Sequence, residues 1–201
     1  MTITAHAGAM GTAPNTLESV RVCAAAAGVI EVDVRFLGDA AILGHDKNQG
    51  GPLLEDCLKI VAEAGADINL DLKERSDISG IAALVRQYGL EGRAFFTGVC
   101  ANEIAAVVGS GLAYYLNCAP RRSQKSAASL VKAAKELGAV GLNIQYRLCS
   151  RTLVKEAHAA GLLVSVWTVD KAPAMRRMIR LGVDNITTRR PDICEGLLHA
   201  I

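Results

Sequence analysis

Hydrophobic and polar residues follow two kinds of pattern along this chain. In short runs such as VIEVDVR at positions 29–35, every second residue is apolar, which is typical of a strand with one buried face. Between these runs lie longer segments such as LLEDCLKIVAEAG, which begins beside Pro52 and ends at Gly65, as a helix does. The pattern therefore predicts strands and helices in alternation along the chain.

The pattern contains eight strand-helix units. Strands separated by helices pair in parallel, so we expect a (β/α)8 TIM barrel, an α/β fold formed as a single domain by residues 1–201 with short loops. An open, doubly wound sheet is the alternative, but no G-x-G-x-x-G motif follows the first strand, which disfavours the dinucleotide-binding role of that fold. Asn15, with Glu18 three residues later, is predicted to cap the first helix. The strands are expected at about 2–6, 29–35, 67–73, 93–98, 112–118, 139–144, 162–169 and 183–188.

Composition narrows the classes of protein to consider. With 201 residues of which 51% are apolar, the chain can bury one sizeable core. The net charge of +2 and the absence of a basic run with interleaved aromatics disfavour nucleic acid as a partner. No apolar stretch is long enough for a transmembrane segment and no leader precedes the first strand, so we expect a cytoplasmic protein. The six cysteines lack C-x-x-C spacing and are interpreted as small buried hydrophobes.

Carboxylates gather where strands end. Glu31 and Asp33 share the polar face of one strand, and two carboxylates on a partly buried face repel each other unless a cation lies between them. Taken alone, a Glu-x-Asp pair is more often a solvated face. However, Asp71 lies at the end of the next long strand, and barrel enzymes build their sites at these strand ends. Three hard oxygen ligands predict a site for Mg²⁺ or Ca²⁺.

Groups for acid-base chemistry lie close to the same ends in the sequence. Lys73 follows Asp71 by two residues and adds positive charge beside the metal, which suits an anionic substrate such as a phosphate. His6 ends the first strand, and His45 lies twelve residues beyond Asp33. Cleavage of a phosphodiester needs an acid and a base near neutral pH, and the two histidines can supply both. Their presence makes a phosphodiester the expected small-molecule substrate.

These residues resemble the motifs of the glycerophosphodiester phosphodiesterases. The resemblance spans nearly the whole chain and implies a barrel with a divalent metal ion and a histidine pair. The family's His-Arg-Gly, Glu-Asn-Thr, Glu-x-Asp, His-Asp, acidic-x-Lys and C-terminal motifs are similar, in that order, to His6-Ala7-Gly8, Pro14-Asn15-Thr16, Glu31-Val32-Asp33, His45-Asp46, Asp71-Leu72-Lys73, and the runs at 166–170 and 182–192.

The chain departs from the family pattern in four places. Ala7 replaces an arginine that would grip the phosphate, and Asp71 replaces a glutamate, as it does in the related sphingomyelinase D-like phospholipases, which also lack that arginine. The insertion that covers the substrate after the His-Asp motif is reduced to KNQGG at 47–51, so we expect an open pocket. Arg189 stands where the family more often has an aspartate, and it either supplies the missing guanidinium or is a surface arginine paired with an acid.

The sequence thus predicts metal-dependent hydrolysis of a glycerophosphodiester or a similar small phosphodiester. His6 and His45 are the expected acid and base, and Lys73, Trp167 and Arg189 the expected substrate-binding residues, although Trp167 can equally well fill the barrel. The attacking group is either water or a hydroxyl of the substrate, which would give a cyclic phosphate. Two alternatives remain: a phospholipase D-like enzyme of the sphingomyelinase D type, and a non-catalytic barrel that binds metal or phosphate.

Overall fold

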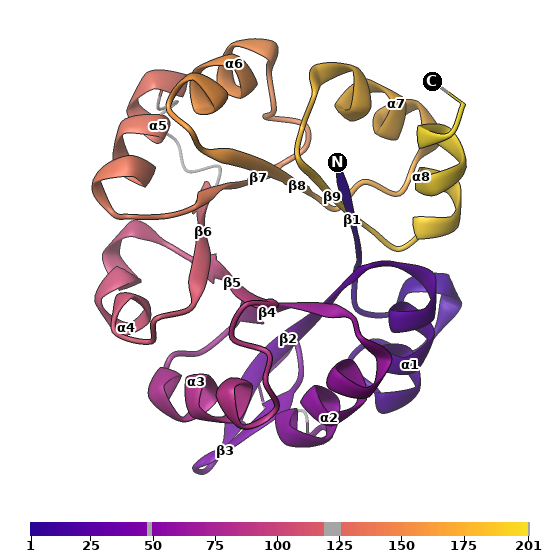
Figure 1. The fold of residues 1–201 in the computed structure, drawn as a ribbon, viewed down its shortest axis with the longest axis vertical. Coiled ribbons are helices and arrows are strands. Elements are labelled where there is room, and N and C mark those ends of the chain that lie inside the picture. The colour runs from indigo at the N-terminus through magenta and orange to yellow at the C-terminus, as the bar shows by residue number, and fades with distance from the viewer. Residues whose placement is uncertain (48–49, 119–125, 201) are drawn as a thin grey trace.

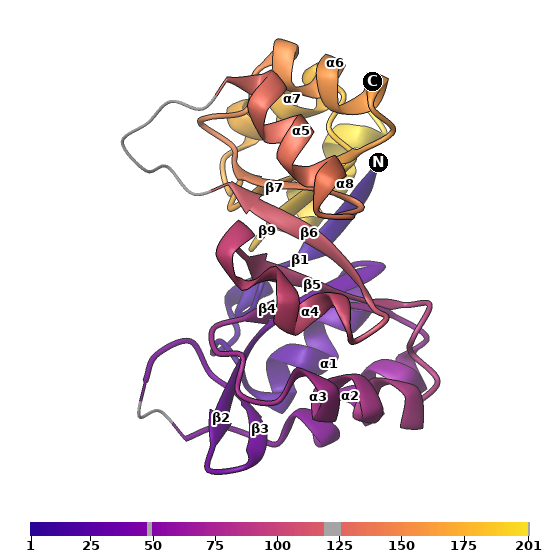
Figure 2. The ribbon, with the colours of Figure 1, turned by 90° about the vertical axis from the view of Figure 1, so that its left-hand side faces the viewer.

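The sheet of this protein closes into a ring with helices on its outside. The computed structural model describes residues 1–47, 50–118 and 126–200. β1 (Thr2–Ala5) pairs in parallel with β9 (Asn185–Thr188) on one side and with β2 (Val29–Leu37) on the other, which closes the ring. Figures 1 and 2 show the helices surrounding the strands. The predicted (β/α)8 TIM barrel is confirmed.

The strands between β2 and β9 follow chain order around the ring, and each is followed by a helix that packs outside it. The α-helices that follow β1 and the β2–β3 pair are α1 (Leu17–Ala26) and α2 (Leu54–Ala64), and a short 3-10 helix η1 (Ala9–Gly11) precedes α1. The other elements are β4 (Asp67–Leu72), α3 (Ile78–Gln87), β5 (Ala94–Val99), η2 (Ala101–Glu103), α4 (Ile104–Val108), β6 (Ala113–Cys118), α5 (Ala127–Glu136), β7 (Gly141–Gln145), α6 (Arg151–Ala159), β8 (Leu163–Trp167), α7 (Ala172–Leu181) and α8 (Pro191–Leu198).

One strand, β3 (Ala40–Leu43), lies outside the ring. It pairs antiparallel with β2 after a turn at Gly38, and Figure 1 shows the resulting hairpin projecting from the barrel. This pairing extends β2 to Leu37, two residues beyond the end that the sequence predicted, because residues 35–37 hydrogen-bond to β3 instead of to a barrel strand. The hairpin returns the chain to the barrel rim, where the Gly44 amide donates to the carbonyl oxygen of Asp33.

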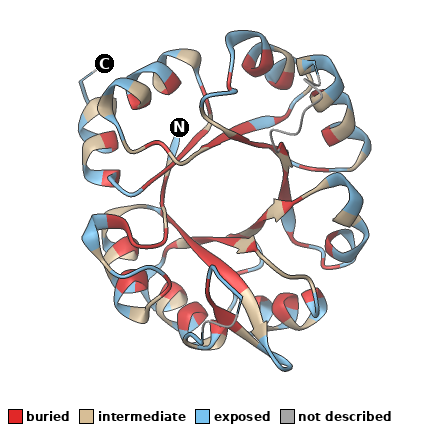
Figure 3. Ribbon diagram, turned by 180° about the vertical axis from the view of Figure 1, so that it is seen from behind, coloured by how far each residue is buried: buried red, intermediate tan, exposed pale blue. Residues whose placement is uncertain are grey.

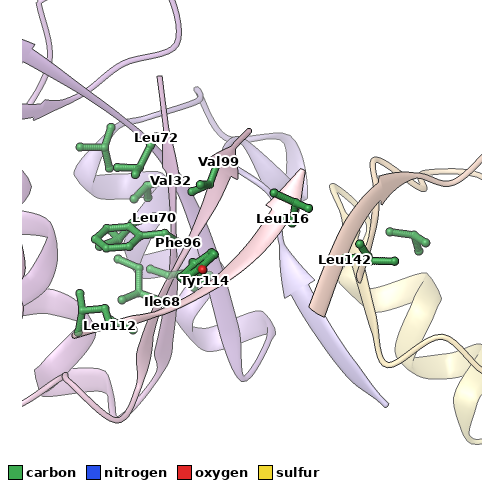
Figure 4. Packing of buried hydrophobic residues seen from close by; sticks show 14 of the residues in the cluster. Val32, Ile68, Leu70, Leu72, Phe96, Val99, Leu112, Tyr114, Leu116 and Leu142 are labelled. Carbon is green, nitrogen blue, oxygen red and sulfur yellow. The ribbon is translucent and has the colours of Figure 1, made fainter. Parts of the chain in front are cut away.

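Strand side chains divide between an apolar outer layer and a polar interior. In β4, Ile68, Leu70 and Leu72 are buried in the layer between strands and helices, whereas Asn69 and Asp71 alternate with them and face inward. Figure 4 shows part of the apolar layer, and Figure 3 shows burial concentrated along the strands and on the inner faces of the helices. Buried polar residues of the other strands include Thr4, Glu31, Asp33, Thr97, Asn143, Ser165, Asn185 and Thr187.

Cysteines contribute to the apolar layer as the sequence predicted. Five of the six are buried in the core. Burial raises the pKa of Cys57 to about 12 and that of Cys194 to about 11, so these thiols carry no charge at neutral pH. Among helices formed by the described residues, none has both the length and the apolar character to cross a bilayer.

Candidate functional site

Three carboxylates meet inside the barrel near the carboxyl ends of β2 and β4. The parallel register of these strands sets Asp33 directly beside Asp71, and Glu31 lies two residues before Asp33 on the same inward face. One carboxylate oxygen from each residue lies within 4.8 Å of the other two. Glu31 and Asp33 are buried, and Asp71 is half-buried. The structure therefore brings together the three residues that the sequence predicted as metal ligands.

The pKa values of Glu31 and Asp33 shift in opposite directions. The pKa of Glu31 is raised to about 7: burial is the main cause, the attraction of His6 opposes it, and the negative charges of Asp33 and Asp71 add to it. Burial also acts to raise the pKa of Asp33, but the ammonium of Lys73 and the hydrogen bond from Asn15 outweigh it and lower that pKa. Glu31 is thus the carboxylate whose charge is least compensated.

The ammonium of Lys73 lies between two of these carboxylates. Its Nζ atom is 2.8 Å from Asp33 Oδ1 and also contacts Asp71 Oδ2. Although burial alone lowers the pKa of a lysine, Asp71 and Asp33 raise the pKa of Lys73 above its usual range. One ammonium among three carboxylates leaves surplus negative charge, and the ligand atoms are all oxygen, so the cluster fits a hard divalent cation such as Mg²⁺ or Ca²⁺.

His6 follows β1 and lies beside the carboxylate cluster. Its Nδ1 atom is 3.7 Å from Glu31 Oε2 and 2.9 Å from the carbonyl oxygen of Ala7. A carbonyl oxygen only accepts hydrogen bonds, so Nδ1 carries the proton and Nε2 is the basic nitrogen of the neutral ring. Glu31 is itself held in place, because the Ala7 amide donates to its Oε2 atom at 2.8 Å.

His45 lies on the loop that follows β3. Its Nδ1 atom is 2.7 Å from Asp46 Oδ1, so this ring also presents Nε2 as its basic nitrogen. Both His45 and Asp46 are largely exposed, with side-chain exposures of 62% and 67%. His6, Asp33 and His45 line one cleft, with a volume of about 630 Å³, at the mouth of the barrel.

Arg189 and Trp167 occupy different places relative to this cleft. Arg189 lines the cleft, and its Nη1 atom is 3.0 Å from Asp170 Oδ2, so it is paired with an acid and also faces the space beside the histidines. Trp167 is the half-buried last residue of β8, and it is not among the described residues that line the cleft. Its Nε1 atom is buried with no partner among the described residues. Residues 48–49 of the shortened KNQGG segment lie outside the described residues.

Asn15 supports the site in a way that the sequence did not predict. Its Nδ2 atom donates to Asp33 Oδ2 at 2.7 Å, and its Oδ1 atom accepts from the Asp33 amide at 3.1 Å. The predicted helix cap at Asn15 is wrong: the Thr16 side chain caps α1 by accepting from the Ser19 amide. An asparagine just before a helix is typical of a cap, and only the packing of this segment against β2 shows its actual partner.

Replacing Asn15 by alanine is expected to lower the free energy of unfolding by about 2 kcal/mol, because the buried amide of Asp33 loses its acceptor and its carboxylate loses a donor. Asn15 also has a left-handed φ of 58°, which alanine adopts less readily than asparagine. Replacing Thr16 by alanine removes the cap and an exposed hydrogen bond to the Ala13 carbonyl oxygen, and should cost about 1 kcal/mol. Urea unfolding of both variants checks this order, and a smaller loss for the Asn15 variant would contradict it.

Comparisons with known proteins agree with this geometry. The family model described as "Glycerophosphoryl diester phosphodiesterase family" matches residues 59–193. The chain is 36% identical over 62 residues to the glycerophosphodiester phosphodiesterase GDPD4 of Arabidopsis thaliana, a stretch that covers 31% of this chain and 19% of that protein. It is 43% identical over 48 residues to the dermonecrotic toxin LvSicTox-alphaII1 of Loxosceles variegata, covering 23% of this chain and 17% of the toxin.

The chain therefore spans less than a fifth of the length of each of these curated relatives. A solved structure shares the whole fold: the phosphodiesterase OLEI02445 of Oleispira antarctica, in complex with the product sn-glycerol-3-phosphate, superposes with a TM-score of 0.82 and 19% identity over 99% of this chain and 97% of that chain. The family model covers well over half of the sequence. This chain belongs to the glycerophosphoryl diester phosphodiesterase family.

Proposed function

We propose that this protein is a divalent-metal-dependent phosphodiesterase that hydrolyses glycerophosphodiesters, or similar small phosphodiesters, to an alcohol and glycerol phosphate. One observation carries the proposal: a cluster of three carboxylates within 4.8 Å of one another lies beside His6, and a cleft joins His6 and Asp33 to His45. Family membership and the product bound to the Oleispira antarctica phosphodiesterase support the choice of substrate.

The carboxylates of Glu31, Asp33 and Asp71 would hold the metal ion. When bound, a divalent cation supplies Lewis-acid polarisation of a phosphoryl oxygen. The ammonium of Lys73 adds positive charge beside the phosphate, and burial of the cluster strengthens both effects by excluding water. These residues thus have the arrangement needed to offset the charge of a phosphodiester.

The two histidines supply proton transfer. In each ring Nδ1 is engaged, with Ala7 in one case and Asp46 in the other, which leaves Nε2 to exchange a proton with the substrate. One Nε2 accepts the proton of the attacking water, and the other donates a proton to the leaving alcohol oxygen. The Asp46 carboxylate accepts the hydrogen bond from Nδ1 of His45 at 2.7 Å and so fixes which ring nitrogen exchanges the proton.

A second outcome is attack by a hydroxyl of the substrate itself, which gives a cyclic phosphate. The Asp-x-Lys sequence at 71–73, shared with sphingomyelinase D-like phospholipases, favours it, as does the short similarity to a dermonecrotic toxin. Phosphorus NMR of the protein with glycerophosphocholine and Mg²⁺ or Ca²⁺ tests both outcomes. A glycerol phosphate signal supports hydrolysis, a cyclic phosphate signal supports the second outcome, and no change with a panel of soluble and lipid diesters leaves only a binding role.

Arg189 is proposed to supply the guanidinium that Ala7 lacks. It lines the cleft, and Asp170 holds both its backbone amide and its Nη1 atom, which fixes the direction of the side chain. We expect Arg189→Ala to raise KM about tenfold with little change in kcat, because a charge-assisted bond to a non-reacting oxygen acts equally on substrate and transition state. Arg190→Ala is the matched control, since Arg190 pairs with Asp192 and does not line the cleft. An unchanged KM for Arg189→Ala would exclude this role.

A further inference from the structure

His45 has little local support for a residue that transfers protons. It lies beyond β3, which is outside the barrel ring, and its ring is largely exposed. The ring's hydrogen-bond partner, Asp46, is its neighbour in sequence and moves with it. Neither feature fixes the loop relative to the carboxylates inside the barrel, and proton transfer depends on placement to within a fraction of an ångström.

Besides the hydrogen bond from the Gly44 amide to the Asp33 carbonyl oxygen, a half-buried guanidinium ties residue 45 itself to the barrel. Arg35 lies near the end of β2, and its Nε atom donates to the main-chain carbonyl oxygen of His45 at 2.8 Å. Its Nη1 atom donates to Glu74 Oε1 at 2.6 Å, and the second carboxylate oxygen of Glu74 accepts from the Phe36 amide at 3.2 Å. The side chain of Arg35 is only 13% exposed, so water screens this pair weakly.

Glu74 links Arg35 to the carboxylate cluster. It follows Lys73, whose ammonium contacts Asp33 and Asp71, so the acid that anchors Arg35 comes from the same strand end as the carboxylate cluster. Because a guanidinium is a rigid planar fork, its bonds to the carbonyl and the carboxylate hold the two acceptors at a set separation. A lysine has one nitrogen on a flexible stem and cannot impose that separation.

We infer that Arg35, anchored by Glu74, is a positioning residue that holds His45 at a fixed place relative to the carboxylate cluster. This inference rests on the proposed function and deepens it, since it concerns how one of the two histidines is placed. Arg35 acts through the main chain of residue 45, so its effect on turnover depends on the presence of the imidazole at that position.

A double-mutant cycle tests this dependence. Arg35→Gln is expected to lower kcat for glycerophosphocholine by roughly 10- to 100-fold, with KM changed less than about threefold, because a displaced imidazole weakens transition-state rather than ground-state interactions. In a His45→Ala background the same change should have no further effect on kcat, although the main-chain carbonyl is still present. Arg35→Lys keeps the charge but lacks the planar fork, so it should recover only part of kcat.

Arg93→Gln is the matched control. Arg93 also joins an acid, Asp67, and a main-chain carbonyl, that of Ala66, but at the opposite end of the barrel. Exposed ion pairs contribute little to stability, so Arg93→Gln should leave kcat within about twofold of the wild type. If both Arg35 variants retain wild-type kcat, or if Arg35→Gln lowers kcat equally with and without the imidazole, the inference is overturned.

Hydrogen exchange gives a readout that needs no turnover. Amides of residues 43–46 should exchange faster in Arg35→Gln than in the wild type and in Arg93→Gln, because the loop loses the side-chain tie to β2 and keeps the Gly44–Asp33 hydrogen bond. If the wild type hydrolyses no diester, or if His45→Ala is fully active, the proposed function or the role of His45 fails, and exchange alone decides whether Arg35 holds the loop. Unchanged exchange would overturn the inference in either case.

Discussion

Replacing His6 by glutamine is expected to lower kcat for a glycerophosphodiester by about 10³-fold, the range found for loss of a positioned acid or base. The amide of glutamine can still bond to the Ala7 carbonyl, so the loop keeps its shape while the basic Nε2 is lost. His6 lies 3.7 Å from Glu31 but is not one of the three carboxylates. Metal affinity should therefore change little. Steady-state kinetics together with metal titration separates the two effects.

His158 supplies the control for this variant. It also lies beside a carboxylate, with Nε2 at 2.8 Å from Asp184 Oδ2, but Asp184 precedes β9 and so lies at the amino-terminal end of the barrel strands. His158→Gln should therefore keep wild-type kcat. If His6→Gln were as active as His158→Gln, His6 would be neither the acid nor the base, and the proposed mechanism would fail with it.

Metal affinity is expected to fall steeply as the solution becomes acidic. Burial raises the pKa of Glu31 to about 7, so below that pH a proton must leave Glu31 before a cation binds. Competition with one proton of this pKa makes the apparent Kd at pH 5.5 roughly 25-fold weaker than at pH 7.5. Calorimetric titration with Mg²⁺ or Ca²⁺ at the two pH values measures the ratio.

In the metal-free protein, the same pKa shift makes the folding stability decrease as the pH rises, whereas the metal affinity increases. The pKa of Glu31 is raised above its ordinary value near 4.5, so folding takes up a proton between about pH 4.5 and 7. Its favourable contribution to stability is therefore complete below that window and is lost as the pH rises through it. Glutamine carries no charge at any pH, so Glu31→Gln should remove the pH dependence of both the metal affinity and the folding stability. Persistence of the full 25-fold ratio in this variant would assign it to another group.

The fold and the carboxylate cluster were predictable because both follow from local periodicity. Alternation of strands and helices predicts a parallel barrel, and a period of two places Glu31 and Asp33 on one face. Asp71 then lies beside Asp33 through the register of β2 and β4, which any closed parallel barrel would bring close. The sequence thus predicted which acids meet without information on any contact between them.

The remaining parts of the site depend on contacts that no local pattern encodes. Asn15 has the sequence position of a cap but bonds to Asp33, and Lys73, which the sequence assigned to the substrate, pairs with Asp33 and Asp71. For Arg189, the sequence left open a phosphate ligand or an ion pair, and the structure shows the ion pair with Asp170 at the edge of the cleft. Such choices are decided by which partner is within reach after folding.

Because of the hairpin formed by β2 and β3, the two histidines follow strands that are held in the sheet to different degrees. His6 follows a strand bonded on both sides along its length, whereas the segment that leads to His45 follows β3, which pairs with β2 and, at one isolated bridge, with Leu53. Opening of an edge hairpin requires less free energy than unfolding of a closed ring. On warming, catalysis should therefore stop at a lower temperature than the loss of helical circular dichroism, and cooling from that intermediate range should restore it fully.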